Sequence, residues 1–273
     1  MEPLSPIQMH ERFEEIYRTW NRREFVHPDP LEFVLKFEDP ADQELAGLIA
    51  SSLAYGNVGY ILKSLEKVFN VLSRPAADLK AMGRKDLLEE LGSFRHRWTT
   101  GEDLAFFLRG IAVLRDEYGS LENCFLQGAG EGDQDVIPAL TGFVAKLRSA
   151  SGRRDSSLLA CPSMGSACKR MFLYLRWMVR RDEVDPGPWS QASSAQLVVP
   201  MDVHMHRVSF QLGLTSRRQA DLKSALEVTG FFRELEPEDP VKYDFAMTRP
   251  GIRSQLEPPA GFDQFNAENV QLC

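Results

Sequence analysis

Two segments of this sequence carry residues whose types and spacing suit chemistry on a phosphate-bearing ligand. The first, CPSMGSACKRMFLYLRWMVRR at 161–181, contains a Pro-Ser-Met-Gly turn and then a predicted helix that begins at Ser166. A helix N-terminus offers free backbone N–H groups and the positive end of the helix dipole to an anion. Lys169 lies near this end among apolar residues, which favour an amine nucleophile. A capped core helix with a solvated lysine is the alternative interpretation.

The second segment, PMDVHMHRV at 200–208, places Asp202 where it would cap a helix, and capping alone explains an aspartate there. A metal site is the alternative, since Asp202 and His206 share a face in a helix, and Asp202, His204 and His206 share one in a strand. Two ligands from one segment are too few, and the chain shows no other histidine or cysteine cluster. We therefore predict neither a metal nor a cofactor.

Charge is distributed unevenly along the chain. The 32 lysines and arginines and 39 acids give a net charge of −7, which argues mildly against a nucleic-acid partner. Between residues 169 and 223, however, nine basic residues face five acids, for a net charge of +4, whereas residues 234–273 carry −5. The basic excess therefore coincides with both segments and supplies the local positive potential that phosphate binding requires.

Helical periodicity dominates the rest of the sequence. A helix begins with Ser5 as its N-cap and Pro6 in its first turn, and a turn-rich break follows at 25–30. Only 196–199 (QLVV) resembles a strand, and it is too short to found a sheet. The pattern predicts an all-α protein with helices at 5–20, two or three within 31–72, and helices at 103–118 and 136–147.

Membrane and secretion signals are missing from the sequence. No apolar run approaches the roughly 18 residues of a membrane helix, and the first residues lack an apolar signal core. The four cysteines form no CxxC pair, so we expect reduced thiols. We predict a cytoplasmic protein with no membrane partner and, because residues after Ser254 are polar and broken by proline, a flexible tail.

A turn, a lysine-bearing helix, a loop and a Pro-x-Asp-x-His segment together resemble the active-site core of the helix-hairpin-helix DNA glycosylases, the superfamily of endonuclease III and 8-oxoguanine glycosylase. The motifs SACKR, LRWMVR, PMDVH and DPVKYDFA resemble more closely a bacterial family of unknown function near this superfamily, over about 25–252. The hairpin departs from the usual L-P-G-x-G, Ala167 stands at the usual lysine position, and the iron–sulfur cysteines of the endonuclease III branch are absent.

The resemblance implies a two-lobed helical bundle, with one lobe at 42–181, a second formed by 1–41 plus 182–253, and a tail at 254–273. It implies a monomeric base-excision repair glycosylase, with AP lyase activity, that removes an oxidised purine such as 8-oxoguanine from double-stranded DNA. Lys169 and Asp202 would be its catalytic pair. The expected DNA contacts are Gly165, Ser166, Arg170, Arg176, Arg207 and Tyr55. The expected base-pocket residues are Tyr174, Trp177, Trp189 and His204.

Two other functions are compatible with the same residues. A non-catalytic nucleic-acid-binding protein on the glycosylase scaffold would explain the altered hairpin. A metal-dependent hydrolase would use Asp202, His204 and His206. Individually, such aromatic residues are more often part of a core, and the arginines suit a solvated basic face equally well.

Overall fold

Helices make up nearly all the regular structure of this protein. A computed structural model describes residues 6–152, 157–164 and 166–252, and strands occur there only as a two-residue antiparallel pair, β1 (Arg95–His96) and β2 (Thr99–Thr100). The predicted all-α class is confirmed. None of the described helices is long and apolar enough to cross a lipid bilayer.

The helices before residue 152 follow the predicted pattern closely, with three helices inside 31–72 and one at each of the two later predicted sites. Side chains cap two of their starts: Asp39 accepts a hydrogen bond from the Ala41 N–H (2.7 Å), and Thr100 and Asp103 form a reciprocal capping box. These helices are α2 (Leu31–Val34), α3 (Pro40–Ser52), α4 (Val58–Val71), α5 (Pro75–Ala81), α6 (Arg84–Leu91), α7 (Gly101–Tyr118), α8 (Leu121–Leu126) and α9 (Ile137–Ser151).

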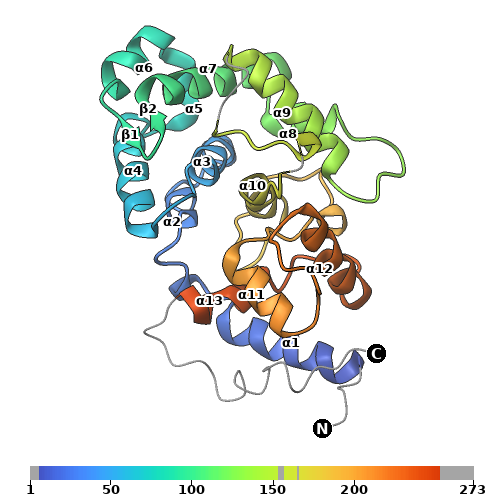
Figure 1. Cartoon of the computed structure of the whole chain (residues 1–273). Coiled ribbons are helices and arrows are strands. Elements are labelled where there is room, and N and C mark those ends of the chain that lie inside the picture. Colours follow the sequence, from blue (N-terminus) through green and yellow to red (C-terminus); the bar gives the residue numbers. More distant parts are fainter. Residues whose placement is uncertain (1–5, 153–156, 165, 253–273) are drawn as a thin grey trace.

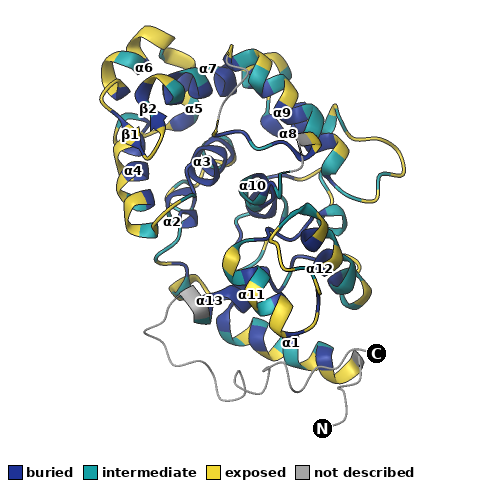
Figure 2. Ribbon diagram, in the orientation of Figure 1, coloured by how far each residue is buried: buried dark blue, intermediate teal, exposed yellow. Residues whose placement is uncertain are grey.

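Helix α10 (Lys169–Val179) lies in the middle of the molecule, between the α2–α9 helices and those that follow it (Figure 1). It is apolar on most sides, and it is buried together with α3 for most of its length (Figure 2). Gly47 lets the two helices approach closely, because a Cβ there would lie 2.5 Å from the Met178 Cε. The lysine-bearing helix is therefore held by packing along its whole length.

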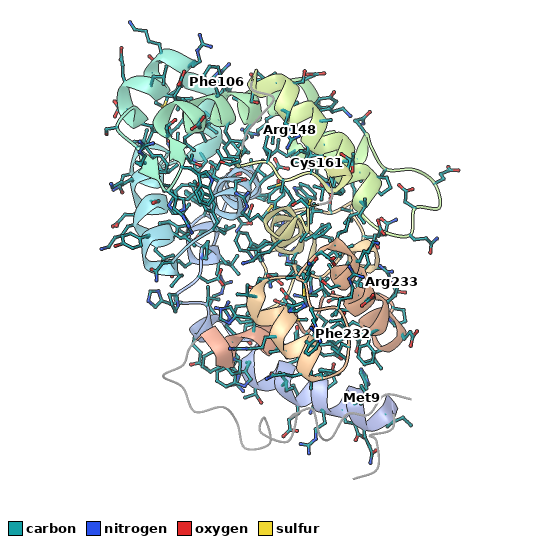
Figure 3. The ribbon with its side chains drawn as sticks, viewed as in Figure 1. Met9, Phe106, Arg148, Cys161, Phe232 and Arg233 are labelled. Carbon is teal, nitrogen blue, oxygen red and sulfur yellow. The ribbon has the colours of Figure 1, made fainter. Side chains whose placement is uncertain are left out.

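The first helix and the last ones lie together on the other side of α10 (Figure 1). They are α1 (Pro6–Trp20), α11 (Val203–Gln211), α12 (Leu222–Leu235) and α13 (Asp244–Ile252). Short 3₁₀ turns occur at η1 (Arg23–Phe25), at η2 (Pro162–Met164), which packs against α9, and at η3 (Ser194–Gln196). The Phe13 ring of α1 lies 5.2 Å from the ring of Phe232, labelled in Figure 3, and 5.3 Å from that of Tyr243. Aromatic packing thus joins the two ends of the described chain.

A buried cluster of opposite charges anchors α10 to the segment that follows it. Arg176 lies 2.5 Å from Asp244 and 3.1 Å from Asp185, and the side chains of these residues are 5%, 6% and 0% exposed. Arg180 pairs with Asp185 as well. Burial raises the pKa of Asp185, although both arginines oppose that shift. The cluster is completed by two further partners of Arg180, Asp182 (2.9 Å) and Asp239 (2.9 Å).

Of three local predictions, one is confirmed, one needs correction and one lies beyond the described residues. The strand-like segment 196–199 founds no sheet, as expected: Gln196 ends the 3₁₀ turn at 194–196, and the Val199 N–H donates to the Thr229 hydroxyl (3.0 Å) instead of to a neighbouring strand. The lysine-bearing helix begins at Lys169 and not at Ser166, since Cys168 has the left-handed φ of 48°. The tail at 254–273 lies outside the described residues, and the boundaries of the two lobes stay predictions.

We predict that Asp185→Asn lowers the free energy of unfolding by about 3–5 kcal/mol, because it leaves two buried guanidinium groups short of a carboxylate. Urea denaturation followed by circular dichroism measures this loss. Lys85→Met is the control: the Lys85–Glu89 pair (3.7 Å) is 89% and 65% exposed, so its loss should change stability by no more than about 0.5 kcal/mol. Equal effects of the two substitutions would contradict the role assigned to the cluster.

Candidate active site

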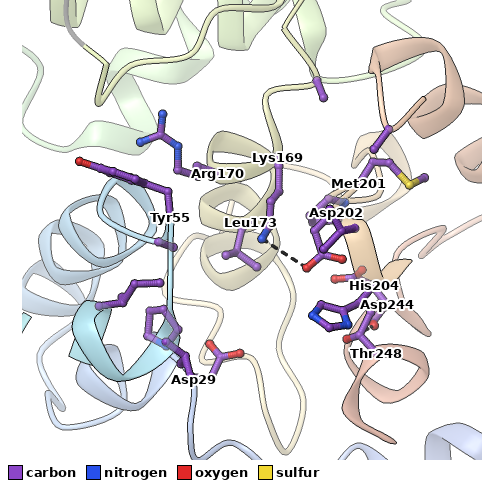
Figure 4. Close-up of a pocket in the computed structure, with 18 of the residues that line it drawn as sticks. Asp29, Tyr55, Lys169, Arg170, Leu173, Met201, Asp202, His204, Asp244 and Thr248 are labelled. Carbon is purple, nitrogen blue, oxygen red and sulfur yellow. Dashed lines mark hydrogen bonds and ion pairs between the residues drawn. The ribbon is translucent and has the colours of Figure 1, made fainter. Parts of the chain in front are cut away.

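Lys169 and Asp202 face one another across the start of two helices. Lys169 is the first residue of α10, and Asp202 is the N-cap of α11. The Lys169 Nζ lies 3.2 Å from the Asp202 Oδ2, as the dashed line in Figure 4 shows, while the Asp202 Oδ1 accepts a hydrogen bond from the Met205 N–H (2.7 Å). The two residues that the sequence singled out, 33 positions apart, therefore form an ion pair in the folded chain.

The ion pair opens into a cavity of about 760 Å³. Helix α10 forms its floor, and the Lys169 side chain, which is 37% exposed, rises from that floor. The turn between α3 and α4, at 54–58, forms one wall, and residues 200–204 with the start of α13 form the other, so that Tyr55 and His204 lie on opposite sides in Figure 4. This volume lies within the range of small-ligand pockets, roughly 300–1,000 Å³.

Four helices begin at this cavity, since the first residues of α4, α10, α11 and α13 all line it: Val58, Lys169, Val203 and Asp244. Asn57 caps α4 through the Gly59 N–H (3.0 Å), and Asp202 caps α11, but α10 has no side-chain cap among the described residues. The positive ends of four helix dipoles thus converge on one space. Such an arrangement favours a ligand that carries negative charge.

The wall opposite Tyr55 carries paired charges. The Arg249 guanidinium donates to Asp29 (2.7 Å), and Arg176 donates to Asp244 (2.5 Å). Burial raises the pKa of Asp244 to about 6 against the opposing effect of Arg176, and the negative charge of Asp202 adds to the increase. These residues shape the cavity electrostatically, and each arginine is already engaged by a carboxylate.

The structure brings four of the predicted DNA contacts to the cavity: Ser166, Arg170, Arg176 and Tyr55. Arg170 is not available to a phosphate, because its guanidinium donates to the backbone carbonyls of Ser52 and Ser157 (2.5 Å each). Tyr55 is half-buried, and its hydroxyl donates to the His96 carbonyl (3.0 Å). Both residues are better described as supports of the cavity wall.

The remaining predicted DNA contacts to be placed are Arg176, Arg207 and Gly165. The expected phosphate contact of Arg176 needs correction, because this arginine is only 4% exposed and holds Asp185 and Asp244. Arg207 is exposed on α11 but does not line the cavity. Gly165 lies outside the described residues.

The predicted base pocket also needs correction. Tyr174 and Trp177 are fully buried on α10, and Trp189 is 6% exposed, so none of them lines the cavity. The Trp189 indole N–H donates to the buried carboxylate of Glu44 (2.8 Å), which fixes the loop after α10 to α3. Helix α10 is apolar nearly all round, which is typical of a buried helix. Of the four predicted residues, only His204 lines the cavity.

The residues proposed for a metal-dependent hydrolase do not converge. His206 turns away from Asp202, and its Nε2 lies 2.9 Å from the Arg217 carbonyl oxygen. Within the described residues, the acid and histidine atoms that do gather belong to His10, Glu14 and Glu236, and Lys242 pairs with both glutamates there, at 2.5 and 3.0 Å. The geometry therefore gives the hydrolase interpretation no support.

Sequence reasoning missed several cavity residues, among them the charged or hydroxyl-bearing Asp29, Asp244, Thr248 and Arg249. Asp244 lies within the DPVKYDFA motif, and Thr248 follows it by four positions. This spacing places both residues on one helix face. That spacing was the available signal, but only the folded chain shows which face meets Lys169.

Comparison with known proteins identifies the family of this chain. Residues 29–253 match the family described as "Protein of unknown function (DUF2400)", so the chain belongs to that family. No curated protein and no solved structure matches the chain. The relationship to the helix-hairpin-helix glycosylases stays a prediction.

One oxygen of Asp202 caps α11 and the other pairs with Lys169, so substitutions that keep or remove the capping oxygen should differ in their effect on stability. Asp202→Ala removes the cap of α11 and should lower the free energy of unfolding by about 1 kcal/mol, whereas Asp202→Asn retains a capping oxygen and should cost much less. Urea denaturation of both variants measures the difference. If asparagine proves as destabilising as alanine, the capping role of Asp202 is refuted.

Proposed function

We propose that this protein is a DNA glycosylase with AP lyase activity that removes an oxidised purine, such as 8-oxoguanine, from double-stranded DNA. The observation that carries the proposal is the Lys169–Asp202 ion pair (3.2 Å), which presents an amine to a cavity large enough for an extruded nucleotide. The resemblance of the PMDVH and SACKR segments to the glycosylase core supports the same function.

The chemistry starts from the ion pair. The Lys169 ammonium must lose a proton before it can attack, and the Asp202 carboxylate is within hydrogen-bond reach to accept it. The neutral amine then attacks C1′ of the sugar, the C1′–N bond to the base breaks, and the base leaves with the bonding electrons and takes up a proton. The nitrogen, now bonded to C1′, loses its extra proton, and the C1′–O4′ bond breaks as O4′ takes up a proton, so that the opened sugar is joined to Lys169 as a protonated Schiff base. Loss of a C2′ proton then breaks the C3′–O bond, which cleaves the strand.

Binding of the substrate draws on the helix N-termini at the cavity. An extruded nucleotide in the cavity brings its phosphates close to the starts of α4, α10 and α11, where the helix dipoles favour negative charge. The uncapped start of α10 has backbone N–H groups that no side chain of the described residues caps. The cavity therefore attracts DNA locally although the chain as a whole carries a charge of −7.

We predict that sodium borohydride traps a covalent adduct between the protein and DNA that contains an abasic site, and that Lys169→Gln abolishes it. The reason is that reduction of a Schiff base makes the bond to the lysine permanent. Gel mobility of the labelled DNA measures the adduct, first with abasic DNA and then with 8-oxoguanine and other lesions. Lys223→Gln, an exposed lysine on α12, is the matched control and should trap as well as wild type.

In the same assay, Asp202→Asn should slow base removal by at least about a hundredfold, as expected for loss of a general base. Asp39→Asn is its control, because Asp39 caps α3 in the same way but does not line the cavity. Trapping by Lys169→Gln at the wild-type rate would overturn the proposed chemistry. If Lys169→Gln traps nothing but still binds DNA and restores function in a deletion strain, the protein is a non-catalytic nucleic-acid-binding protein.

A further inference from the structure

A ladder of four stacked side chains leads from the cavity to the surface of the molecule. The Arg170 guanidinium lies over the Tyr55 ring at 5.0 Å, the Tyr55 ring stacks on Trp98 at 5.2 Å with an angle of 18° between the planes, and the Arg97 guanidinium lies over Trp98 at 4.7 Å. Figure 4 shows the inner end of this ladder, where Arg170 lies beside Tyr55. The ladder joins α10, which carries Lys169, to the β1–β2 hairpin.

The inner half of the ladder is fixed. Both ends of the Arg170 guanidinium donate to backbone carbonyls, and the Tyr55 hydroxyl lies 2.6 Å from the Thr99 hydroxyl. Because Arg170 covers one face of the Tyr55 ring and Trp98 covers the other, Tyr55 has no free face for a base. The outer half is different, since Trp98 is 57% exposed and Arg97 is exposed as well.

A second hollow of about 410 Å³ adjoins the cavity on the side of this outer half. The two spaces share Tyr55 and Asn57. Two arginines and no carboxylate occur among the described residues that line the hollow, and Tyr60, which is 70% exposed, stands at its edge. The hollow is therefore both aromatic and basic.

This combination points to one kind of ligand. Exposed aromatic side chains gathered at one place mark an interaction surface. Aromatic rings stack on nucleobases of any sequence once the bases are unpaired, and arginines neutralise the phosphates between them. Lys63 and Lys67 extend the basic character, because they follow Tyr60 at three and seven positions along α4 and are exposed.

We propose that Tyr60, Arg95, Arg97 and Trp98 form a binding surface for unpaired nucleotides of a nucleic-acid strand. In the proposed glycosylase, on which this placement in the reaction rests, the surface holds the single-stranded segment that opens beside an extruded base. A base takes the place of the Arg97 guanidinium on the face of Trp98 that Arg97 covers in the free protein. The displaced arginine then reaches an adjacent phosphate.

Tryptophan fluorescence provides a direct test. The chain has four tryptophans, and the other three, Trp20, Trp177 and Trp189, are only 3%, 0% and 6% exposed, so quenching by a stacked base reports on Trp98. Titration of the whole protein with undamaged oligothymidine should quench its fluorescence. The same strand annealed into a duplex should quench much less, because its bases are already stacked.

Variants then assign the binding to the surface. Binding of fluorescein-labelled oligothymidine, measured by anisotropy, should weaken at least about fivefold with Trp98→Ala and with Tyr60→Ala, the loss of one stacked base. Trp98→Phe should be intermediate. Arg97→Asn should also weaken binding, and asparagine tolerates the left-handed φ of 52° at this position. Arg84→Ala is the matched control, because Arg84 lies 5.1 Å from the Phe106 ring (labelled in Figure 3) and neither residue lines the cavity.

The surface is refuted if oligothymidine causes no quenching, if duplex and single strand bind equally, or if Trp98→Ala and Tyr60→Ala bind as well as Arg84→Ala. The assay uses undamaged DNA and needs no Schiff base, so its outcome is independent of the glycosylase chemistry. Normal oligothymidine binding together with failure of every lesion to form an adduct would refute the proposed function and leave the surface intact. Adduct formation without quenching would do the reverse.

Discussion

The pairing of Arg176 and Arg180 with four aspartates, of which Asp185 and Asp244 are buried, is the interaction on which the geometry of the cavity depends. A charge taken out of water costs several kcal/mol, so each guanidinium requires carboxylates within reach. These carboxylates come from the turn after α10 and from the residues around the start of α13. Since α11 packs against α13, the same cluster also sets the position of Asp202 relative to Lys169. Floor and wall of the cavity cannot shift apart without leaving a buried charge unpaired.

Successive residues at the start of α10 have separate tasks. Lys169 presents its amine to the cavity, while Arg170 is tied to backbone carbonyls and supports the aromatic ladder. One carboxylate oxygen of Asp202 caps α11, and the other pairs with Lys169. Because the capping oxygen holds Asp202 in place, the long lysine side chain is the partner that can move toward a substrate. The rigid support and the amine that we propose as the nucleophile are thus adjacent in the sequence.

Local features of the sequence predicted more of this structure than tertiary ones did. Asp202 as a cap and the helix ending at Tyr118 follow from interactions within a few residues, so they were predictable. The partners of Arg176 are up to 68 residues away, and no local pattern shows that this arginine is buried. Tyr174 and Trp177 were assigned to a pocket although the apolar periodicity of α10 already indicated a core helix. Trp98 was missed because exposure of an aromatic ring is a property of the fold.

The central claim is that the sugar of an extruded nucleotide sits against the Lys169 amine, and a crystal structure of a complex tests it most directly. The complex would contain a duplex with a tetrahydrofuran abasic analogue, which occupies the site but cannot form a Schiff base. The account predicts that the analogue enters the cavity and that its anomeric-equivalent carbon lies about 3–3.5 Å from the Lys169 Nζ, as a near-attack geometry requires. DNA bound on another face of the protein, or an analogue that stays in the duplex away from Lys169, would contradict it.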